Sequence, residues 1–282
     1  VDASQTSTLT VAVVDASSDN SFDPLADQTV SVTTADNDVA GFTVAQSGGS
    51  TSVSESGTTD TFTVVLNAQP DSGTSVVLSV TSSDTGEATV NSPLTFTSAN
   101  WNTPQTVTVT GADDNLLDGT QTSTFTISVV DGSSVDQFDS VADQTVSGTT
   151  VDNDSAGFTV AEISGTSVSE SGTTDTFTVV LGAQPTNNVV IAITSSDTGE
   201  ATVNSPLTFT SANWNTPQTV TVTGVDDNII DGTITSTLTI SVVDAVSDDD
   251  FDGVANQTVS ATTTDNDVAG FTIVQSSGST SV

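Results

Sequence analysis

The stretch TSSDTGEATVNSPLTFTSANWNTPQTVTVTG occupies residues 81–111 and returns without a change at residues 194–224. Its segments LTFT and QTVTVTG alternate apolar and polar side chains, which is the period of a β-strand with one buried face. The repeat extends further, because the pattern DNDxAGFT begins at Asp36, Asp152 and Asp265. The chain is therefore a tandem array with a period of about 113 residues, and we expect a function that many copies perform together.

Period-two runs rich in Val, Thr, Ile and Phe recur between turn residues, without the 3.6-residue period of a helix. Seven segments of the first complete repeat fit strands: 41–53 with a break at the Gly48-Gly49 pair, 61–66, 75–81, 94–97, 105–111, 124–130 and 145–151. Seven strands in about 110 residues predict an all-β fold of tandem seven-stranded immunoglobulin-like β-sandwiches, arranged head to tail as a rod. In segment 61–66, Phe62, Val64 and Leu66 share one face and are expected in the core.

The repeat boundaries predict two complete sandwiches, residues 39–154 and 155–267. Residues 1–38 match only the last two strands of a repeat, and residues 268–282 match only the first strand. We therefore expect the chain to be a window from a longer polypeptide. Each copy ends in Asp-Asn-Asp and the next strand begins within about three residues, which is too short for a freely swivelling linker.

The charge of the chain has one sign. All 36 charged side chains are acidic, and the formal net charge is -36 because Lys, Arg and His are absent. Such a surface repels nucleic acid and anionic membranes. Oxygen ligands without imidazole or thiolate favour a hard divalent cation, so Ca²⁺ is the expected cofactor and Mg²⁺ the second possibility. An acidic surface that serves only solubility, as in halophilic proteins, is the alternative.

The missing residue types exclude several classes of enzyme. Without His, Cys or Lys, the chain cannot form a Ser-His-Asp triad, a Cys nucleophile or a Schiff-base lysine. A carboxylate pair of the glycosidase kind is the common hydrolytic arrangement that remains. We expect a protein that is not an enzyme, with a glycoside hydrolase as a remote alternative. No stretch approaches the roughly 18 apolar residues of a membrane-spanning helix, so no membrane insertion of this segment is expected.

Strand direction places most acids at one end of each sandwich. The loops after the first, third and fifth strands and the end of the seventh strand lie at the same pole. In the first copy these positions hold Glu55, Asp84, Glu87, Asp113, Asp114, Asp118, Asp152 and Asp154. In the second copy they hold Glu170, Asp197, Glu200, Asp226, Asp227, Asp231, Asp265 and Asp267. Converging carboxylates must protonate, spread apart or bind cations, and calcium is the favoured outcome.

The loop between the sixth and seventh strands, at the opposite pole, is acidic as well. It reads DGSSVDQFDSVAD from Asp131 and DAVSDDDFDGVAN from Asp244. Two interpretations remain open: the loop adds ligands across the junction to the previous copy, or it is a solvated charged loop.

Four motifs of each complete copy, SVSESG, DTGEA, TVTGxDDNxxDG and the closing DND, together resemble the Calx-β domain. That family is named for the calcium-binding regulatory domains of the sodium/calcium exchanger, and it is common in giant bacterial repeats-in-toxin (RTX) adhesins. The resemblance covers essentially the whole chain and implies a sandwich that binds Ca²⁺ at its C-terminal pole. The implied ligands are Glu55, Asp84, Asp113, Asp114, the carbonyl of Leu116, Asp118, Asp152, Asp154, Glu170, Asp197, Asp226, Asp227, the carbonyl of Ile229, Asp231, Asp265 and Asp267, with Asp36 and Asp38 at the first junction.

The chain departs from the exchanger pattern in two places. Apolar dipeptides at 116–117 and 229–230 stand where the exchanger loop is richer in acids, and Asn153 and Asn266 occupy the middle of the closing triplet. Fewer charges imply fewer ions or weaker sites, which suits a calcium-rich external medium.

Trp101 and Trp214 precede the fifth strand in the motif NWNTPQ. We expect each to cap the edge of its sandwich, with Pro104 or Pro217 setting the entry to the strand. Stacking on a glycan is the alternative role.

These features predict a structural function. We expect an extender segment of a secreted bacterial adhesin or extracellular fibre, outside the cell or on the bacterial surface, whose inter-repeat junctions are rigidified by Ca²⁺. Its expected partners are neighbouring repeats of the same chain and other copies of the fibre. The alternative is an adhesion module that binds a glycan, ice or another cell, which clustered exposed aromatic residues would favour.

Overall fold

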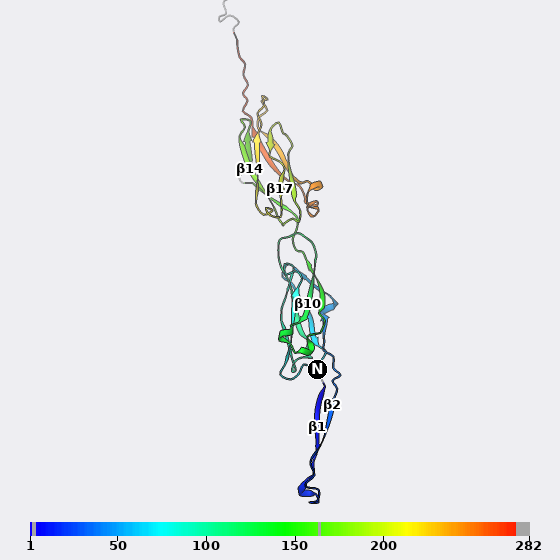
Figure 1. The fold of residues 1–282 in the computed structure, drawn as a ribbon. Helices are drawn as coiled ribbons and strands as arrows, with labels where there is room; N and C mark the ends of the chain where they lie inside the picture. The colour runs from blue at the N-terminus through cyan, green and yellow to red at the C-terminus, as the bar shows by residue number, and fades with distance from the viewer. Residues whose placement is uncertain (2–3, 163–164, 275–282) are drawn as a thin grey trace, which may run out of the picture. The chain divides into compact units, whose positions relative to one another are not determined.

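The computed structural model describes residues 1, 4–162 and 165–274. The chain divides into two compact units, residues 1–114 with 120–153, and residues 115–119 with 154–282. Strands dominate both units, and the helical elements are short 3-10 turns (Figure 1). The prediction of an all-β fold is confirmed.

The first sandwich has one sheet of four strands and one of five. The four-stranded sheet has the order β3 (Phe42–Gln46), β5 (Thr59–Leu66), β9 (Gln105–Gly111) and β7 (Ala88–Val90). The five-stranded sheet has the order β4 (Thr51–Ser54), β11 (Gln144–Val151), β10 (Gln121–Val129), β6 (Ser75–Ser82) and β8 (Leu94–Thr97). Neighbouring strands are antiparallel except β4, which pairs parallel with β11.

The second sandwich has the same topology. Its four-stranded sheet has the order β12 (Phe158–Glu162), β14 (Thr174–Leu181), β18 (Gln218–Gly224) and β16 (Ala201–Val203). Its five-stranded sheet has the order β13 (Thr166–Ser169), β20 (Gln257–Thr264), β19 (Ile234–Val242), β15 (Val189–Ser195) and β17 (Leu207–Phe209). Here β13 pairs parallel with β20.

Side chains from both sheets form one core in each sandwich. Phe62 and Val64 of β5 and Phe125 and Ile127 of β10 are at most 1% exposed. The rings of Phe62 and Phe125 stack with their centroids 6.3 Å apart. Leu66 is buried too, so the three core residues predicted for segment 61–66 are confirmed. The intervening Thr and Ser residues give each sheet a second, hydroxyl-bearing face.

Residues 39–154, all of which are described, hold nine strands rather than the seven predicted. The expected first strand is split between the sheets, with β3 in one and β4 in the other. The chain crosses at Gly48 and Gly49, whose φ angles of 61° and 82° are open to glycine. The other addition is β7, which has too few residues for a periodicity to show. The remaining segments coincide with their predicted ranges to within three residues at each end.

The flanking segments contain fewer strands. β1 (Gln5–Val11) and β2 (Gln28–Thr34) pair as an antiparallel two-stranded sheet. Their Leu9 and Val30 are more than half exposed, whereas Phe125 and Val146, at the equivalent positions of β10 and β11, are buried. The described residues 268–274 form no strand, and the remaining part of that expected strand, 275–282, lies outside the described residues.

Six short 3-10 turns complete the structure: η1 (Asp15–Ser17), η2 (Ser47–Gly49), η3 (Asp131–Ser133), η4 (Asp136–Phe138), η5 (Asp244–Val246) and η6 (Asp249–Phe251) in the described chain. The loops after β10 and β19 contain four of these turns, and Phe138 and Phe251, both 0% exposed, anchor the loops to the cores. Among the described residues, no helix has the length and apolar character needed to cross a membrane.

Candidate metal centre

Carboxylates of the second sandwich converge at one end of its sheets. Glu170 directly follows β13, Glu200 directly precedes β16, and Asp231 lies in the loop from β18 to β19. One oxygen of each lies within 4.8 Å of the other two, and the same holds for Glu170 with Asp265 and Asp267, which follow β20. Because Glu170 belongs to both groups, these five residues form a single cluster, here called the acidic pole.

Strand pairing brings these loops together. β13 runs parallel to β20, so Glu170 and Asp265, which follow the two strands, come to the same edge of the sheet. Gly224, the last residue of β18, lets the corner that carries Glu170 approach closely, since a Cβ at this position would lie 2.1 Å from the carbonyl oxygen of Ser169. Gly111 stands in the same relation to its own corner in the first sandwich.

Two carboxylates of the acidic pole are buried. Glu170 is 1% exposed and Glu200 is 6% exposed. Within the described chain, no donor hydrogen-bonds Glu170 Oε1, Glu200 Oε2 or Asp267 Oδ2, and these oxygens are shielded from solvent. A buried polar atom without a partner carries a desolvation penalty of about 1–3 kcal/mol, and more when it is charged. The acidic pole therefore offers three acceptor oxygens that a cation would satisfy.

The environment of the two buried glutamates opposes their ionisation. Burial raises the pKa of Glu200, and the negative charges of Asp231 and Glu170 raise it further. A hydrogen bond from the Asn266 N–H lowers the pKa of Glu170, but burial and the charge of Asp265 outweigh this bond, so the net shift of that pKa is also upward. Without a cation, part of this pole resists carrying its full charge.

The two aspartates after β20 have opposite shifts. Hydrogen bonds from the backbone N–H groups of Gly232 and Asp267, at 2.9 Å and 2.6 Å, lower the pKa of Asp265. Burial and the charge of Asp265 raise the pKa of Asp267. Asp265 is thus stabilised as a carboxylate by the backbone, whereas the surroundings of Asp267 oppose its ionisation.

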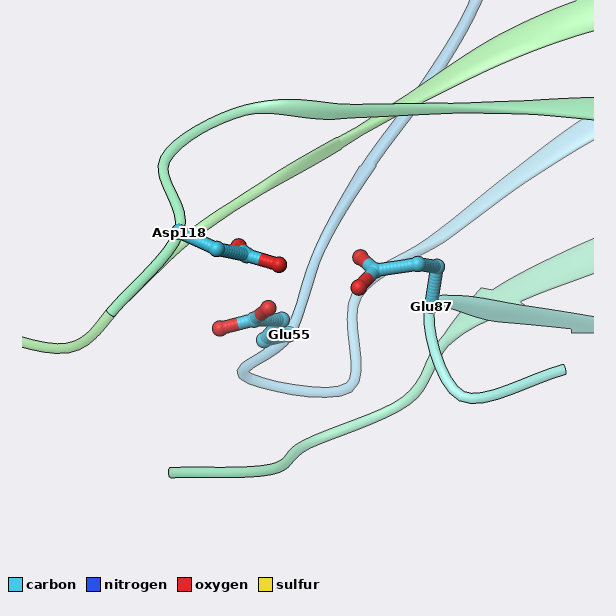
Figure 2. A group of neighbouring side chains, drawn as sticks. All are labelled: Glu55, Glu87 and Asp118. Carbon is cyan, nitrogen blue, oxygen red and sulfur yellow. The ribbon is translucent and has the colours of Figure 1, made fainter. Parts of the chain in front are cut away.

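The first repeat contains corresponding groups. One oxygen of each of Glu55, Glu87 and Asp118 lies within 4.8 Å of the others. Figure 2 shows the three carboxylates directed toward one another. Glu55 and Glu87 are 1% and 7% exposed, as their counterparts are in the second sandwich. Glu55 also groups with Asp114 and Asp154. The group of Glu55, Glu87 and Asp118 thus recurs as Glu170, Glu200 and Asp231, whereas the second group holds Asp114 in place of Asp152, the counterpart of Asp265.

The asparagine in the middle of each closing triplet joins two other loops. The Asn266 N–H donates to Glu170 Oε2 at 3.0 Å, and its side-chain amide donates to Asp226 Oδ1 at 3.0 Å. Asn153 makes the same two bonds in the first sandwich, at 3.2 Å and 3.1 Å. In the sequence this residue counts only as a missing charge, whereas in the structure it is a hydrogen-bond donor to two carboxylates.

Two members of the metal-ligand groups, Glu87 and Glu200, were not among the ligands that the resemblance implies. The acid expected from the same loop was Asp84 or Asp197, and each of these caps its own turn. Asp84 Oδ1 accepts the Gly86 N–H at 2.9 Å, and Asp197 makes the equivalent bond at 3.0 Å. Strand direction places the glutamate at this pole as well, but it stands immediately before the short strand that periodicity misses, so the sequence gave no reason to prefer it to the aspartate of the same loop.

The other expected carboxylate ligands divide into two sets. Those in groups with metal-ligand spacing are Glu55, Asp114, Asp118, Asp154, Glu170, Asp231, Asp265 and Asp267. Those outside any such group in the described residues are Asp36, Asp38, Asp84, Asp113, Asp152, Asp197, Asp226 and Asp227. Local bonds explain two of these positions. Asp227 Oδ1 accepts the Ile229 N–H at 2.6 Å, and Asp36 Oδ1 accepts the Asp38 N–H at 2.9 Å.

The two expected backbone-carbonyl ligands have different surroundings. Ile229 is 60% exposed. Leu116, which belongs to the second unit together with the rest of residues 115–119, forms an isolated parallel bridge with Gln184. The next residue, Leu117, packs against the core of that unit. The apolar dipeptide at 116–117, which the sequence presents as a loss of charge, therefore has a packing role.

The loop after β19 contains a buried carboxylate of a different kind. Asp248 is 4% exposed and accepts hydrogen bonds from Asn187 N–H at 2.6 Å, Thr186 Oγ1 at 2.8 Å and Asp250 N–H at 3.3 Å. Burial raises its pKa, but these bonds outweigh burial, so the pKa lies below its usual value. Among the described residues, the acids of this loop form no group with metal-ligand spacing.

Both tryptophans are half-buried. Trp101 and Trp214 pack against the cores of their sandwiches. The carbonyl oxygen of Trp101 accepts the Leu66 N–H, and that of Trp214 accepts the Leu181 N–H, each at 3.1 Å. These contacts are those expected of residues that cap a sandwich edge.

No protein-family model matches the chain, and no curated protein matches it. Among solved structures, it is similar to the calcium-binding domain CBD12 of CALX1.1, with 13% identity over 71% of this chain and 79% of that one, and a TM-score of 0.26. It is also similar to domains 4 and 5 of the S-layer protein SbsC, with 16% identity over 79% and 97% of the two chains and a TM-score of 0.32. The fold assignment rests on the sheets and cores described above.

Proposed function

We propose that this chain is a structural segment of an extracellular or cell-surface protein, in which each sandwich is stabilised by Ca²⁺ at its carboxylate cluster. One observation carries the proposal. Glu170 and Glu200 are buried with oxygens that accept no hydrogen bond from the described residues, in a chain without any basic side chain. A buried charge requires a partner, and this protein must obtain one from outside.

Calcium suits the available ligands better than other cations. The donors of the acidic pole are carboxylate oxygens alone, which favour Ca²⁺ or Mg²⁺ over zinc and copper. Mg²⁺ gives up its bound water reluctantly and therefore takes few protein ligands, whereas Ca²⁺ accepts six to eight oxygens in flexible geometry. Glu170, Glu200, Asp231, Asp265 and Asp267 would hold the ion, whose positive charge would allow all five to ionise. The proposal assigns these carboxylates to metal binding rather than to catalysis.

The tandem organisation supports an extender role. A fibre requires equivalent joints, and residues 81–111 and 194–224 are identical. The closing DND motif precedes the next strand by only about three residues, so an ion held beside it would restrict the direction in which the chain leaves the sandwich. We therefore propose a calcium-stiffened spacer of a secreted bacterial adhesin of the RTX kind, with neighbouring repeats as its partners.

The calcium proposal predicts a large effect of chelation on thermal stability. Each site contributes about 2.7 kcal/mol when free Ca²⁺ exceeds its Kd 100-fold, so removing calcium should lower the Tm markedly, and Mg²⁺ should restore little of it. Differential scanning calorimetry in calcium, chelator and magnesium measures this. The control is Asp250→Asn, which removes one charge from the loop after β19 and should leave the calcium-dependent part of the Tm unchanged. An identical melt in calcium and chelator at moderate salt would refute the proposal.

The stiffening role has a separate test. With Ca²⁺ bound, the orientation of successive repeats should be restricted, and without it the repelling carboxylates should let the joint bend. Small-angle X-ray scattering should then give a smaller maximum dimension in chelator than in calcium. Equal maximum dimensions in the two conditions, in a sample that calorimetry shows to bind calcium, would leave calcium a stabiliser of single sandwiches and remove the stiffening role.

A further inference from the structure

The asparagine of the closing triplet is placed to decide which carboxylates remain available to a cation. Asn266 is the middle residue of Asp265-Asn266-Asp267, and both of its neighbours in the chain belong to the acidic pole. Its backbone N–H binds Glu170 Oε2, while Glu170 Oε1 accepts no hydrogen bond among the described residues. One donor therefore occupies one oxygen of the shared glutamate and leaves the other for a ligand.

The side chain of Asn266 acts on a second carboxylate. Its Nδ2 lies 3.0 Å from Asp226 Oδ1, and Asp226 falls in no group with metal-ligand spacing among the described residues. An amide nitrogen is a donor without charge, so this bond satisfies Asp226 without any metal ion. A carboxylate at position 266 would be an acceptor instead, and it would face a second carboxylate at the same short distance.

We propose that Asn153 and Asn266 are positioning residues that limit the number of cations at each carboxylate cluster, by holding Asp113 and Asp226 in an amide hydrogen bond. This inference rests on the calcium binding proposed above. The same pair of bonds in both sandwiches, with all four distances between 3.0 Å and 3.2 Å, shows that the arrangement is built into the repeat. The neutral amide also connects the loops in the metal-free state, so that less reorganisation is needed when an ion binds.

The test compares variants of the second sandwich in the full chain. In Asn266→Asp, the new carboxylate and Asp226 form an additional pair of ligands, so isothermal titration calorimetry should show one more Ca²⁺ per chain than the unchanged protein. The double variant Asn153→Asp with Asn266→Asp should bind two more Ca²⁺ ions per chain than the unchanged protein. In Asn266→Ala only Asp226 is released and the pair of carboxylates is not formed, so the number of ions should stay the same, while the affinity should fall about 10- to 100-fold, as for other residues that orient metal ligands.

The double variant Asn266→Asp with Asp226→Asn identifies the partner of the new ligand. It should bind as many ions as the unchanged protein, because the second carboxylate of the pair is gone. Asp226→Asn alone should leave the ion number unaltered. Asn256→Asp is the matched charge control: position 256 belongs to the loop after β19, its counterpart in the first repeat is Asp143, and the change should not alter the number of ions bound.

The outcomes separate this inference from the calcium proposal. If the unchanged protein binds no Ca²⁺, the calcium proposal fails and the inference fails with it. If it binds Ca²⁺ and Asn266→Asp gains no ion, the calcium proposal stands and the inference is overturned. A gain that survives in the double variant would also overturn it, since the additional ion would then not depend on Asp226.

Discussion

Two buried carboxylates at opposite poles of the second sandwich have opposite electrostatics. Glu200 is 6% exposed, its Oε2 accepts no hydrogen bond from the described residues, and its pKa is raised by burial and by neighbouring acids. Asp248 is 4% exposed and accepts three hydrogen bonds, which hold its pKa below the usual value despite burial. Burial is nearly equal, so the hydrogen-bond donors around Asp248 and the neighbouring acids around Glu200 make the difference.

The contrast shows that the number of acids in a loop does not identify a metal site. The loop after β19 is the more densely acidic, with DDD at 248–250, yet its buried carboxylate is satisfied by the protein itself. The acidic pole has its carboxylates spread over several loops and leaves oxygens for an external ligand. The acidic pole therefore has acceptor oxygens open to a cation, whereas the loop after β19 satisfies its own buried carboxylate.

The largest effect should come from replacing one buried carboxylate at each pole. Glu170→Gln removes the residue shared by both groups of the acidic pole, so calcium binding by the second sandwich should be lost and the number of ions per chain should fall. Asp248→Asn should keep every ion, while one of its hydrogen bonds is weakened, at a cost of about 1 kcal/mol in the free energy of unfolding. Isothermal titration and chemical denaturation in calcium measure the two effects. A loss of ions in Asp248→Asn equal to that in Glu170→Gln would show that the two poles do not differ as described.

The carboxylates with raised pKa values and those with lowered pKa values should affect stability in opposite ways as the pH changes. The raised pKa values of Glu170, Glu200 and Asp267 mean that, without calcium, the folded chain binds protons more tightly than the unfolded chain. Their contribution to stability is full below their pKa values in the unfolded chain, which are about 4. It is lost as the pH rises through their raised pKa values in the folded chain. Asp248 and Asp265 behave in the opposite way: their contribution is present above about pH 4 and is lost below it.

Calcium-free protein should accordingly be less stable at neutral pH than at about pH 5, and added Ca²⁺ should reverse the decline because it binds the ionised carboxylates. Thermal melts from about pH 4 to 8, with and without calcium, test this expectation. Glu200→Gln should flatten the calcium-free curve, whereas Asp250→Asn should not. A calcium-free curve that rises steadily toward neutral pH would contradict the account of the acidic pole.

The smallest effect compares one exposed acid from each pole. Asp231 is the exposed member of its group with Glu170 and Glu200, so Asp231→Asn should weaken calcium binding without abolishing it. Asp250→Asn, in the loop after β19, should leave the affinity unchanged. Calcium titrations of the two variants at the same ionic strength measure both affinities. A larger loss of affinity in Asp250→Asn than in Asp231→Asn would show that the poles are wrongly assigned.

Much of the fold was predictable from the sequence because its strands are regular. The Thr-rich alternation located β5, β6, β8, β9, β10 and β11, and it identified Phe62, Val64 and Leu66 as core residues. The strand that was missed, β7, has only three residues, and the strand that was counted once, β3 with β4, changes sheets at a glycine pair. Periodicity depends on several successive residues, so it does not reveal a strand this short.

The carboxylate cluster was predictable only in outline. Strand direction was enough to expect that Glu55, Asp118 and their counterparts would meet at one end of a sandwich, and the structure brings them together. It did not distinguish Glu87 from Asp84, because that choice depends on which side chain caps the turn and which points inward. It also did not reveal Asn153 or Asn266 as a donor to two acids, since neither acid is near it in the sequence.

The tandem repeat, the all-β fold and the lack of basic side chains are evident in the sequence alone, because they follow from composition and from patterns that are local along the chain. The three-dimensional fold sets which acids are buried and which of their oxygens accept a hydrogen bond. Those properties depend on where donors from distant strands and loops come to lie, and the balance between burial and hydrogen bonding at each carboxylate is fixed by that placement.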